Sequence, residues 1–283
     1  MQIRRKLARL LTAFPLINKA VRDARERRLI KALRFHKVSE YDFTILGGNW
    51  LAAGLSSDRP HERAELAIVE ALLAGQDYLI DVGANSGIYS CLAASKGVAA
   101  IAFEPMAANM QVLFANIERN GFAGLIEVMP VALSETVAIL PVYNRGQGAS
   151  LISGWGGGDE VDATLVPVNT LDNILEARLR DKKFVLKIDV EGHEYAVLRG
   201  ARKLLSGCPP VLLELSLTRN HPGGTNPNFE QTFEFMWGLG YRSFVADAGR
   251  DEVTPDTVRA WVAKGVMDTL GENFLFLPRE GAA

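Results

Sequence analysis

The chain has 283 residues, of which 48% are hydrophobic and 23% charged, and its formal net charge is −2. This is the composition of an ordinary soluble globular protein, and it gives no reason to expect a nucleic-acid partner. Two cysteines outside any metal-binding spacing argue against a disulfide framework or a zinc site, and no apolar run is long enough to span a bilayer. We therefore expect a cytoplasmic protein with one large domain.

The N-terminal segment differs in charge from the rest of the chain. Residues 1–37 contain twelve Lys and Arg and two acids, so they carry +10 and leave −12 on the remainder. Between residues 3 and 14, apolar side chains recur at helical spacing beside basic ones. We predict a basic amphipathic helical extension over 1–37, followed by a domain over 38–283. The extension either packs on that domain or contacts the inner face of the membrane peripherally.

Strands and helices alternate along the rest of the chain. A short β pair is predicted in residues 41–55, with Gly47-Gly48 as its turn, and a helix in 61–74. The alternation after residue 77 is typical of an α/β fold with a mostly parallel sheet and helices on both faces. The seven predicted strands are residues 77–82, 99–104, 125–131, 184–189, 210–216, 241–247 and 272–277. Later helices are predicted near 106–120, from Leu171 after a Thr170 cap, and at 192–206, 228–239 and 255–264.

A glycine-rich loop interrupts this alternation. Residues 136–143 and 164–168 alternate as β-strands do, and they flank residues 146–158, which contain six glycines. Such a segment is too flexible for a core and is predicted to be a lid or substrate loop.

The densest motif is the strand, glycine loop and helix start within residues 78–90. It has the pattern Asp81-x-Gly83-x-Asn85-x-Gly87. A dinucleotide fingerprint would need glycine where Asn85 and Ile88 stand, which argues against an NAD-dependent oxidoreductase. At the end of the next strand, 21 residues after Gly83, stands an acid, Glu104. Nucleotide-binding α/β folds place the acid that holds the ribose at about this distance, so an adenosine-containing cofactor is predicted.

Acids also follow other predicted strands. Asp81, Glu104, Asp189 and Glu214 all lie near strand ends, where open α/β sheets bind ligands. A divalent metal shared by Asp189 and Glu214 is conceivable. We expect none, because the ligand pattern of metal-dependent enzymes with a site in this region is not reproduced here.

A reaction at a hydroxyl group would require a proton acceptor. His193, just after the fourth-strand motif, is the predicted base because histidine titrates near neutral pH, and His221 is its rival. Glu191, in the same motif as His193, is expected to orient a neighbour or to bind an acceptor hydroxyl.

The chain resembles the FkbM-type methyltransferases, class I enzymes that use S-adenosylmethionine. Four blocks carry the likeness, and they are residues 81–87, 102–105, 168–172 and 186–192. The likeness covers about 62–277. It implies a seven-stranded Rossmann-like sheet with an antiparallel last strand. It also implies O-methylation of hydroxyls, often on sugars or secondary metabolites.

The resemblance also implies roles for single residues. The backbone of Gly83, Asn85 and Gly87 should cradle the methionine end of the cofactor, and Glu104 should bind both ribose hydroxyls. Ala132 and Ser134 should border the adenine, and Asp81 and Asp189 should face the ammonium and sulfonium groups. His193, Asp189 and Glu214 form the predicted catalytic set.

We therefore predict an S-adenosylmethionine-dependent O-methyltransferase acting on a hydroxyl of a sugar, glycolipid or secondary metabolite. Two alternatives stay open at this point. One is an NAD-dependent oxidoreductase, and the other is a non-catalytic, membrane-attached binding protein that retains the fold.

Overall fold

The computed structural model describes residues 24, 27, 28, 30–38, 41–47, 60–143, 148–157, 163–269 and 271–279, with the side chains of the first long helix described from residue 63. Most of the predicted basic extension, residues 1–23, lies outside these ranges, as does the predicted turn residue Gly48. No helix in the described ranges is long and apolar enough to cross a membrane.

The first strands along the chain, β1 (Arg34–Lys37) and β2 (Thr44–Gly47), form a two-stranded antiparallel ribbon. The sequence predicted a β pair within residues 41–55 with its turn at Gly47-Gly48, and it placed residues 34–37 in the helical extension. The structure differs on both points, because Gly47 is the last residue of β2 and β2 pairs with residues 34–37. Strand β2 is anchored to helix α6 (Ala107–Asn120), because Leu46 N donates to Asn116 Oδ1 at 2.6 Å. Helical periodicity is a weak prior that such tertiary contacts override.

The central sheet has eight strands in the order β12-β11-β13-β10-β9-β3-β4-β5. Their bounds are β3 (Tyr78–Val82), β4 (Ala99–Phe103), β5 (Ile126–Met129), β9 (Phe184–Ile188), β10 (Val211–Glu214), β11 (Tyr241–Val245), β12 (Glu252–Val253) and β13 (Asn273–Pro278). The strands from β10 to β5 are parallel, and β13 lies antiparallel between β10 and β11. The predicted mostly parallel sheet with an antiparallel last strand is confirmed, and the two-residue β12 is the added eighth strand.

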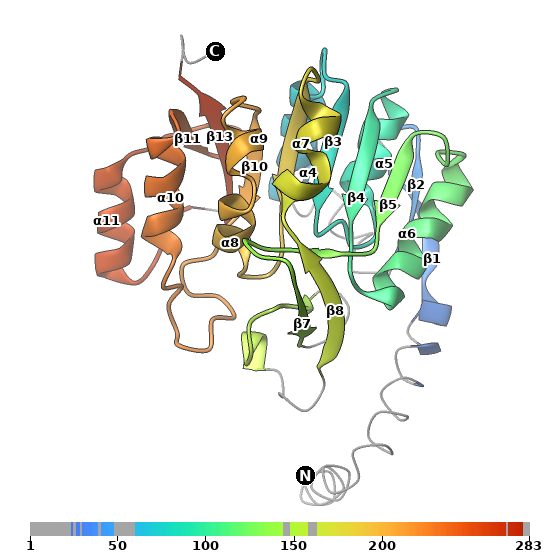
Figure 1. Ribbon diagram of the computed structural model, residues 1–283, viewed down its shortest axis with the longest axis horizontal. Coiled ribbons are helices and arrows are strands. Elements are labelled where there is room, and N and C mark those ends of the chain that lie inside the picture. Colours follow the sequence, from blue (N-terminus) through green and yellow to red (C-terminus); the bar gives the residue numbers. More distant parts are fainter. Residues whose placement is uncertain are drawn as a thin grey trace, which may run out of the picture.

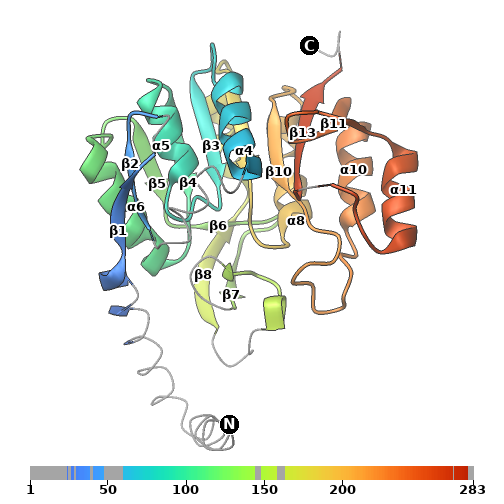
Figure 2. The same ribbon diagram turned by 180° about the vertical axis from the view of Figure 1, so that it is seen from behind.

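Helices cover both faces of this sheet (Figures 1 and 2). Besides α6, they are α4 (Pro60–Leu72), α5 (Ile88–Ser95), α7 (Leu171–Leu179), α8 (Glu194–Arg199), α9 (Arg202–Leu205), α10 (Phe229–Gly238) and α11 (Pro255–Lys264). Alternate side chains of β3 enter two cores, because Ile80 packs with α7–α11 whereas Leu79 packs with α4–α6. Burial on both faces explains why these strands are apolar almost throughout.

The helix predicted over residues 192–206 is instead two short helices, α8 and α9. The break falls at Gly200, where a Cβ would lie 2.1 Å from the Ser134 carbonyl oxygen. Asp172 then caps the second helix, since its carboxylate accepts hydrogen bonds from Lys203 N at 3.0 Å and Leu204 N at 3.1 Å. Asp172, part of one of the family-like blocks, therefore has a structural task.

A second, three-stranded sheet lies beyond the carboxyl ends of the central strands (Figure 1). Its order is β6-β8-β7, with β6 (Ala132–Leu133), β7 (Ala138–Val142) and β8 (Thr164–Asn169). Strands β7 and β8 are the pair predicted to flank the glycine-rich loop. The described part of that loop contains the short 3-10 helix η2 (Trp155–Gly157).

Candidate functional site

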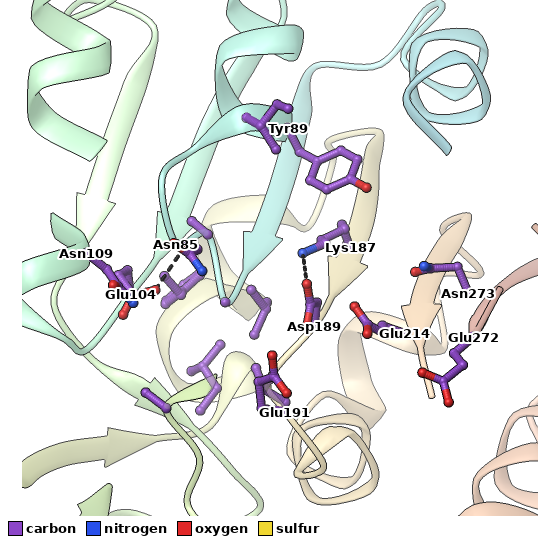
Figure 3. A pocket seen from close by; sticks show the side chains of 18 of the residues that line it. Asn85, Tyr89, Glu104, Asn109, Lys187, Asp189, Glu191, Glu214, Glu272 and Asn273 are labelled. Atoms are coloured by element: carbon purple, nitrogen blue, oxygen red, sulfur yellow. Dashed lines mark hydrogen bonds and ion pairs between the residues drawn. The ribbon is translucent and has the colours of Figure 1, made fainter. Parts of the chain in front are cut away.

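A cavity of about 650 Å³ lies at the carboxyl ends of β3, β4, β9 and β10 (Figure 3). This volume is in the range of small-molecule and cofactor sites. Three of the four predicted strand-end acids line it, and they are Glu104, Asp189 and Glu214. The parallel strand order therefore brings together acids that are far apart in the sequence.

The glycines of the first motif are required mainly by the protein's own packing. Gly83 has φ +76°, and a Cβ there would lie 1.8 Å from the Asp189 carbonyl oxygen. Gly87 has φ +81°, and its Cβ would lie 2.2 Å from Leu113 Cδ1. Positive φ also favours glycine at both positions. Gly83 lines the cavity as well, so only this glycine combines close packing with access to a ligand.

Glu104 is held in place by the loop after β3 and by its own strand end. Asn85, in the left-handed region at φ +52°, donates its backbone N–H to Glu104 Oε2 at 2.9 Å. Met106 N donates to Glu104 Oε1 at 2.8 Å. The Asn109 side chain also hydrogen-bonds this carboxylate. Burial raises the pKa of Glu104, and these three hydrogen bonds offset the rise only in part. A carboxylate has about four acceptor sites, so Glu104 can still accept a hydrogen bond from a ligand.

Asp81 lies beneath the cavity and does not form part of its wall. Its Oδ2 accepts hydrogen bonds from Ser90 Oγ at 2.6 Å and Ser90 N at 3.1 Å, which ties β3 to α5. Within the described residues, Asp81 Oδ1 accepts no hydrogen bond. Burial raises the pKa of Asp81, and the Lys187 charge opposes this. The structure thus gives Asp81 a packing role below the glycine loop.

Lys187 is a cavity residue that sequence reasoning missed. Its Nζ lies 3.1 Å from Asp189 Oδ2 and 4.9 Å from the centre of the Tyr89 ring. Burial lowers the pKa of Lys187, but the nearby carboxylates, Asp189 foremost, outweigh burial and raise it. A lysine inside the otherwise apolar strand β9 was the available sequence signal, because an unpaired lysine is almost never fully buried.

Glu214 lies on the other side of Asp189 (Figure 3). The Asp189 charge, followed by burial, raises the pKa of Glu214 well above its ordinary value. Arg219 forms ion pairs with both Glu214 and Glu272, and all three residues line the cavity. This end of the cavity is therefore polar and acidic.

Neither predicted histidine base lies in the cavity wall. His193 precedes α8, and its Nε2 lies 2.9 Å from Ser134 Oγ. Ser134, expected beside the adenine, does not line the cavity either, whereas Ala132 does. His221 is buried with its ring edge-on to Trp155, 4.7 Å between centroids. Burial lowers the pKa of both histidines.

The described residues hold no group of three or more His, Cys, Asp or Glu side chains that could bind a metal ion. Asp189 and Glu214, which the sequence suggested as conceivable metal ligands, form ion pairs with Lys187 and Arg219, respectively.

The polar and apolar side chains that line the cavity fit S-adenosylmethionine. Glu104 can accept a hydrogen bond from a ribose hydroxyl, and apolar walls of Met106, Ala132 and Leu133 suit an adenine. The charged residues that line the cavity include more acids than bases, which suits a cationic group. The charged residues of the wall are Glu65, Glu104, Asp189, Glu191, Glu214 and Glu272 against Lys187 and Arg219.

Known proteins share this sequence pattern. The family model described as the Methyltransferase FkbM domain matches residues 81–243. The chain is 28% identical over 159 residues to the hexuronic acid methyltransferase AglP of Haloferax volcanii, covering 54% of this chain and 63% of that protein. One similar solved structure is an FkbM methyltransferase from Methylobacillus flagellatus, with 16% identity, TM-score 0.40, and coverage of 71% of this chain and 43% of that chain. Another is an O-methyltransferase from Bacillus cereus in complex with SAH, with 12% identity, TM-score 0.43, and coverage of 79% and 82%.

Proposed function

Because the chain belongs to the FkbM methyltransferase family, which uses S-adenosylmethionine as methyl donor, we propose that it methylates a hydroxyl group of a sugar-containing acceptor. The observation that carries this proposal is a cavity whose two ends differ in the side chains that line them. Glu104 stands at one end and can accept a hydrogen bond from a ligand, and a polar region around Glu214 and Arg219 forms the other. The hexuronic acid named for the Haloferax volcanii relative supports a sugar acceptor. Family membership sets aside the NAD-dependent oxidoreductase.

The residues of this chain divide the work between the two ends. Glu104 would hold the ribose, and the backbone at Gly83 and Asn85, near the start of α5, would lie beside the carboxylate of the donor. Bound S-adenosylmethionine supplies a methyl group on a positively charged sulfur. Thr218, Glu272 and Asn273 line the opposite end, where they can hydrogen-bond acceptor hydroxyls. Methyl transfer depends chiefly on such positioning and on exclusion of water.

Calorimetry with S-adenosylmethionine tests the donor end. Glu104→Ala should weaken binding roughly 10- to 100-fold, because a hydrogen bond to a charged group is lost. Glu127→Ala is the matched control, since Glu127 pairs with Arg178 on the exposed surface. The assignment fails if the wild-type chain does not bind, or if Glu104→Ala binds as tightly as Glu127→Ala.

Transfer of a radioactive methyl group tests the acceptor end. The acceptors are the methyl glycosides of glucose and of glucuronic acid, with mass analysis of the products. An alkali-stable methyl ether is expected. A label released from the glucuronic acid product by mild alkali would identify a methyl ester, and would overturn hydroxyl methylation in favour of carboxylate methylation.

A further inference from the structure

We propose that Glu191 is the base that removes the proton from the acceptor hydroxyl, and that Trp155 of the glycine-rich loop positions it. This inference rests on the proposed hydroxyl methylation. It replaces the two histidines, neither of which lies in the cavity wall.

The position of Glu191 suits this role. It lines the cavity, and Figure 3 shows its carboxylate between Glu104 at the donor end and Glu214 and Glu272 at the acceptor end. The reacting oxygen must meet the methyl carbon between those two ends. A carboxylate there lies where a hydroxyl proton has to leave.

Glu191 is also held at several points. Trp155 Nε1 donates to Glu191 Oε2 at 2.9 Å, and Ser150 Oγ donates to the Glu191 carbonyl oxygen at 2.6 Å. Its backbone adopts the left-handed region at φ +54°. The next residue, Gly192, makes room for the indole, because a Cβ there would lie 2.3 Å from Trp155 Cζ3. Such over-determined geometry is typical of functional positions.

The other central carboxylates are already committed. Asp189 accepts a hydrogen bond from Lys187, and Glu214 is ion-paired with Arg219. Within the described part of the chain, the hydrogen bond to the Glu191 carboxylate comes from the neutral indole. Asp189 and Glu214 are each paired with a cation, whereas Glu191 accepts from a neutral group and keeps its other oxygen for a hydroxyl proton.

The surroundings of Glu191 favour proton uptake. Burial and the Asp189 charge raise the pKa of Glu191, whereas the Trp155 hydrogen bond and the charges of Arg219 and Lys187 lower it, and the net shift is upward. Glu214 is a further charged neighbour. In its ionised form, a carboxylate with a raised pKa is a better base than an ordinary one.

In the methyl-transfer step, an oxygen lone pair of the acceptor forms the new C–O bond while the S–C bond breaks and its electron pair stays on sulfur. The hydroxyl proton passes to the Glu191 carboxylate. A methyl ether, a neutral thioether and a carboxylic acid result, and the acid then releases its proton to water.

The first test follows tryptophan emission against pH in the wild-type chain without acceptor. Emission should change in one step with a midpoint above the ordinary glutamate value of about 4.3. Glu191→Gln and Trp155→Phe should both remove the step. Glu135→Gln, which alters an exposed pair with Arg199, and Trp237→Phe, which alters an indole bonded to Ser243, should keep it. A step that survives in Glu191→Gln would overturn the assignment.

The second test measures kcat for the methyl glycosides of glucose and glucuronic acid. Glu191→Gln should lower kcat roughly 10²- to 10⁴-fold with unchanged affinity for S-adenosylmethionine. Formate should partly restore the rate of Glu191→Ala. Trp155→Phe should move the acidic limb of the kcat profile to higher pH, because it removes a hydrogen bond that stabilises the ionised form.

The outcomes separate the two proposals. Wild-type turnover with an undiminished kcat in Glu191→Gln overturns the base and leaves hydroxyl methylation standing. Loss of S-adenosylmethionine binding in Glu191→Gln makes Glu191 a binding residue and also overturns the base. A wild-type chain that binds S-adenosylmethionine but methylates neither glycoside overturns both.

Discussion

Lys187 Nζ donates a hydrogen bond of 3.1 Å to Asp189 Oδ2 from a side chain that is only 4% exposed. Lys187 lies in β9 and Asp189 directly follows the strand, and both residues line the cavity. A buried charge that loses its partner is strongly destabilising, so this pair has consequences for stability as well as for the site.

Replacing Lys187 by methionine should therefore destabilise the fold. We expect the free energy of unfolding to fall by roughly 3 kcal/mol, the lower end of the range for such losses, because Asp189 retains some exposure. Urea unfolding at pH 7 measures it. Lys203→Met removes an exposed pair with Glu176 and should leave stability nearly unchanged. Equal losses of unfolding free energy in the two variants would show that the buried pair stabilises the fold no more than the exposed pair does.

Three glycine-to-alanine changes should differ in cost although all three positions have positive φ. Gly97 has open space around its Cβ position, so Gly97→Ala should cost about 1 kcal/mol from backbone strain alone. Gly87→Ala should cost more, because it must displace the flexible Leu113 side chain. Gly83→Ala should cost the most, at least ~3 kcal/mol, because it meets the rigid Asp189 backbone. Thermal unfolding that gave a different order would contradict this account of the loop.

Glu194 should make stability depend on pH in the neutral range. Burial raises its pKa to about 7, in spite of hydrogen bonds from Gly192 N and Val190 N. The native state then holds the proton more tightly than the unfolded chain. The free energy of unfolding should therefore fall as pH rises from about 4.5 to about 7, by ~3 kcal/mol in total.

Glu194→Gln should make this decline smaller by the contribution of Glu194, because glutamine accepts the same hydrogen bonds without ionising. Other carboxyls whose pKa values are also raised keep their own contributions, and these include Asp81, Glu104, Glu191 and Glu214. Urea unfolding at pH 5, 6, 7 and 8 compares the slopes. Glu127→Gln, on the exposed surface, should keep the wild-type slope. If Glu194→Gln keeps it as well, the carboxyl does not titrate as described.

The basic N-terminal segment can be tested in the full chain. Replacing Arg4, Arg5 and Lys6 by glutamate should lower the affinity for vesicles containing phosphatidylserine at least roughly 100-fold, since each basic residue near an anionic surface contributes about 1 kcal/mol of binding free energy. Co-sedimentation measures this affinity. Charge reversal is preferable to truncation at residue 38, which would remove β1. Vesicles of phosphatidylcholine alone are the control. Equal sedimentation of variant and wild type would remove this segment from membrane binding.

Much of the fold could be predicted from local patterns. Apolar runs marked all seven long strands of the central sheet, and β-type alternation marked β7 and β8. Local sequence patterns gave the wrong secondary structure where tertiary contacts determine the element. Residues 34–37 pair with β2 in place of extending a helix, and Gly200 divides one predicted helix because it packs on Ser134.

The candidate site divides in the same way. Strand-end position was enough to place Glu104, Asp189 and Glu214 together. It failed for Asp81, whose side chain turns under the loop to Ser90, and it missed Lys187 and Trp155. No local pattern tells which side of a strand end a carboxylate faces, because that depends on the neighbouring strand and helix.

The sequence by itself determined the family and the methyl donor, because the glycine loop and the acid after β4 are short-range features of one strand–loop–helix unit. Only the tertiary structure decided what those features touch. Gly83 is required by the Asp189 backbone on the adjacent strand, and Glu191 is held by a tryptophan from a separate loop. These contacts join segments distant in the chain, so strand order and loop packing set them.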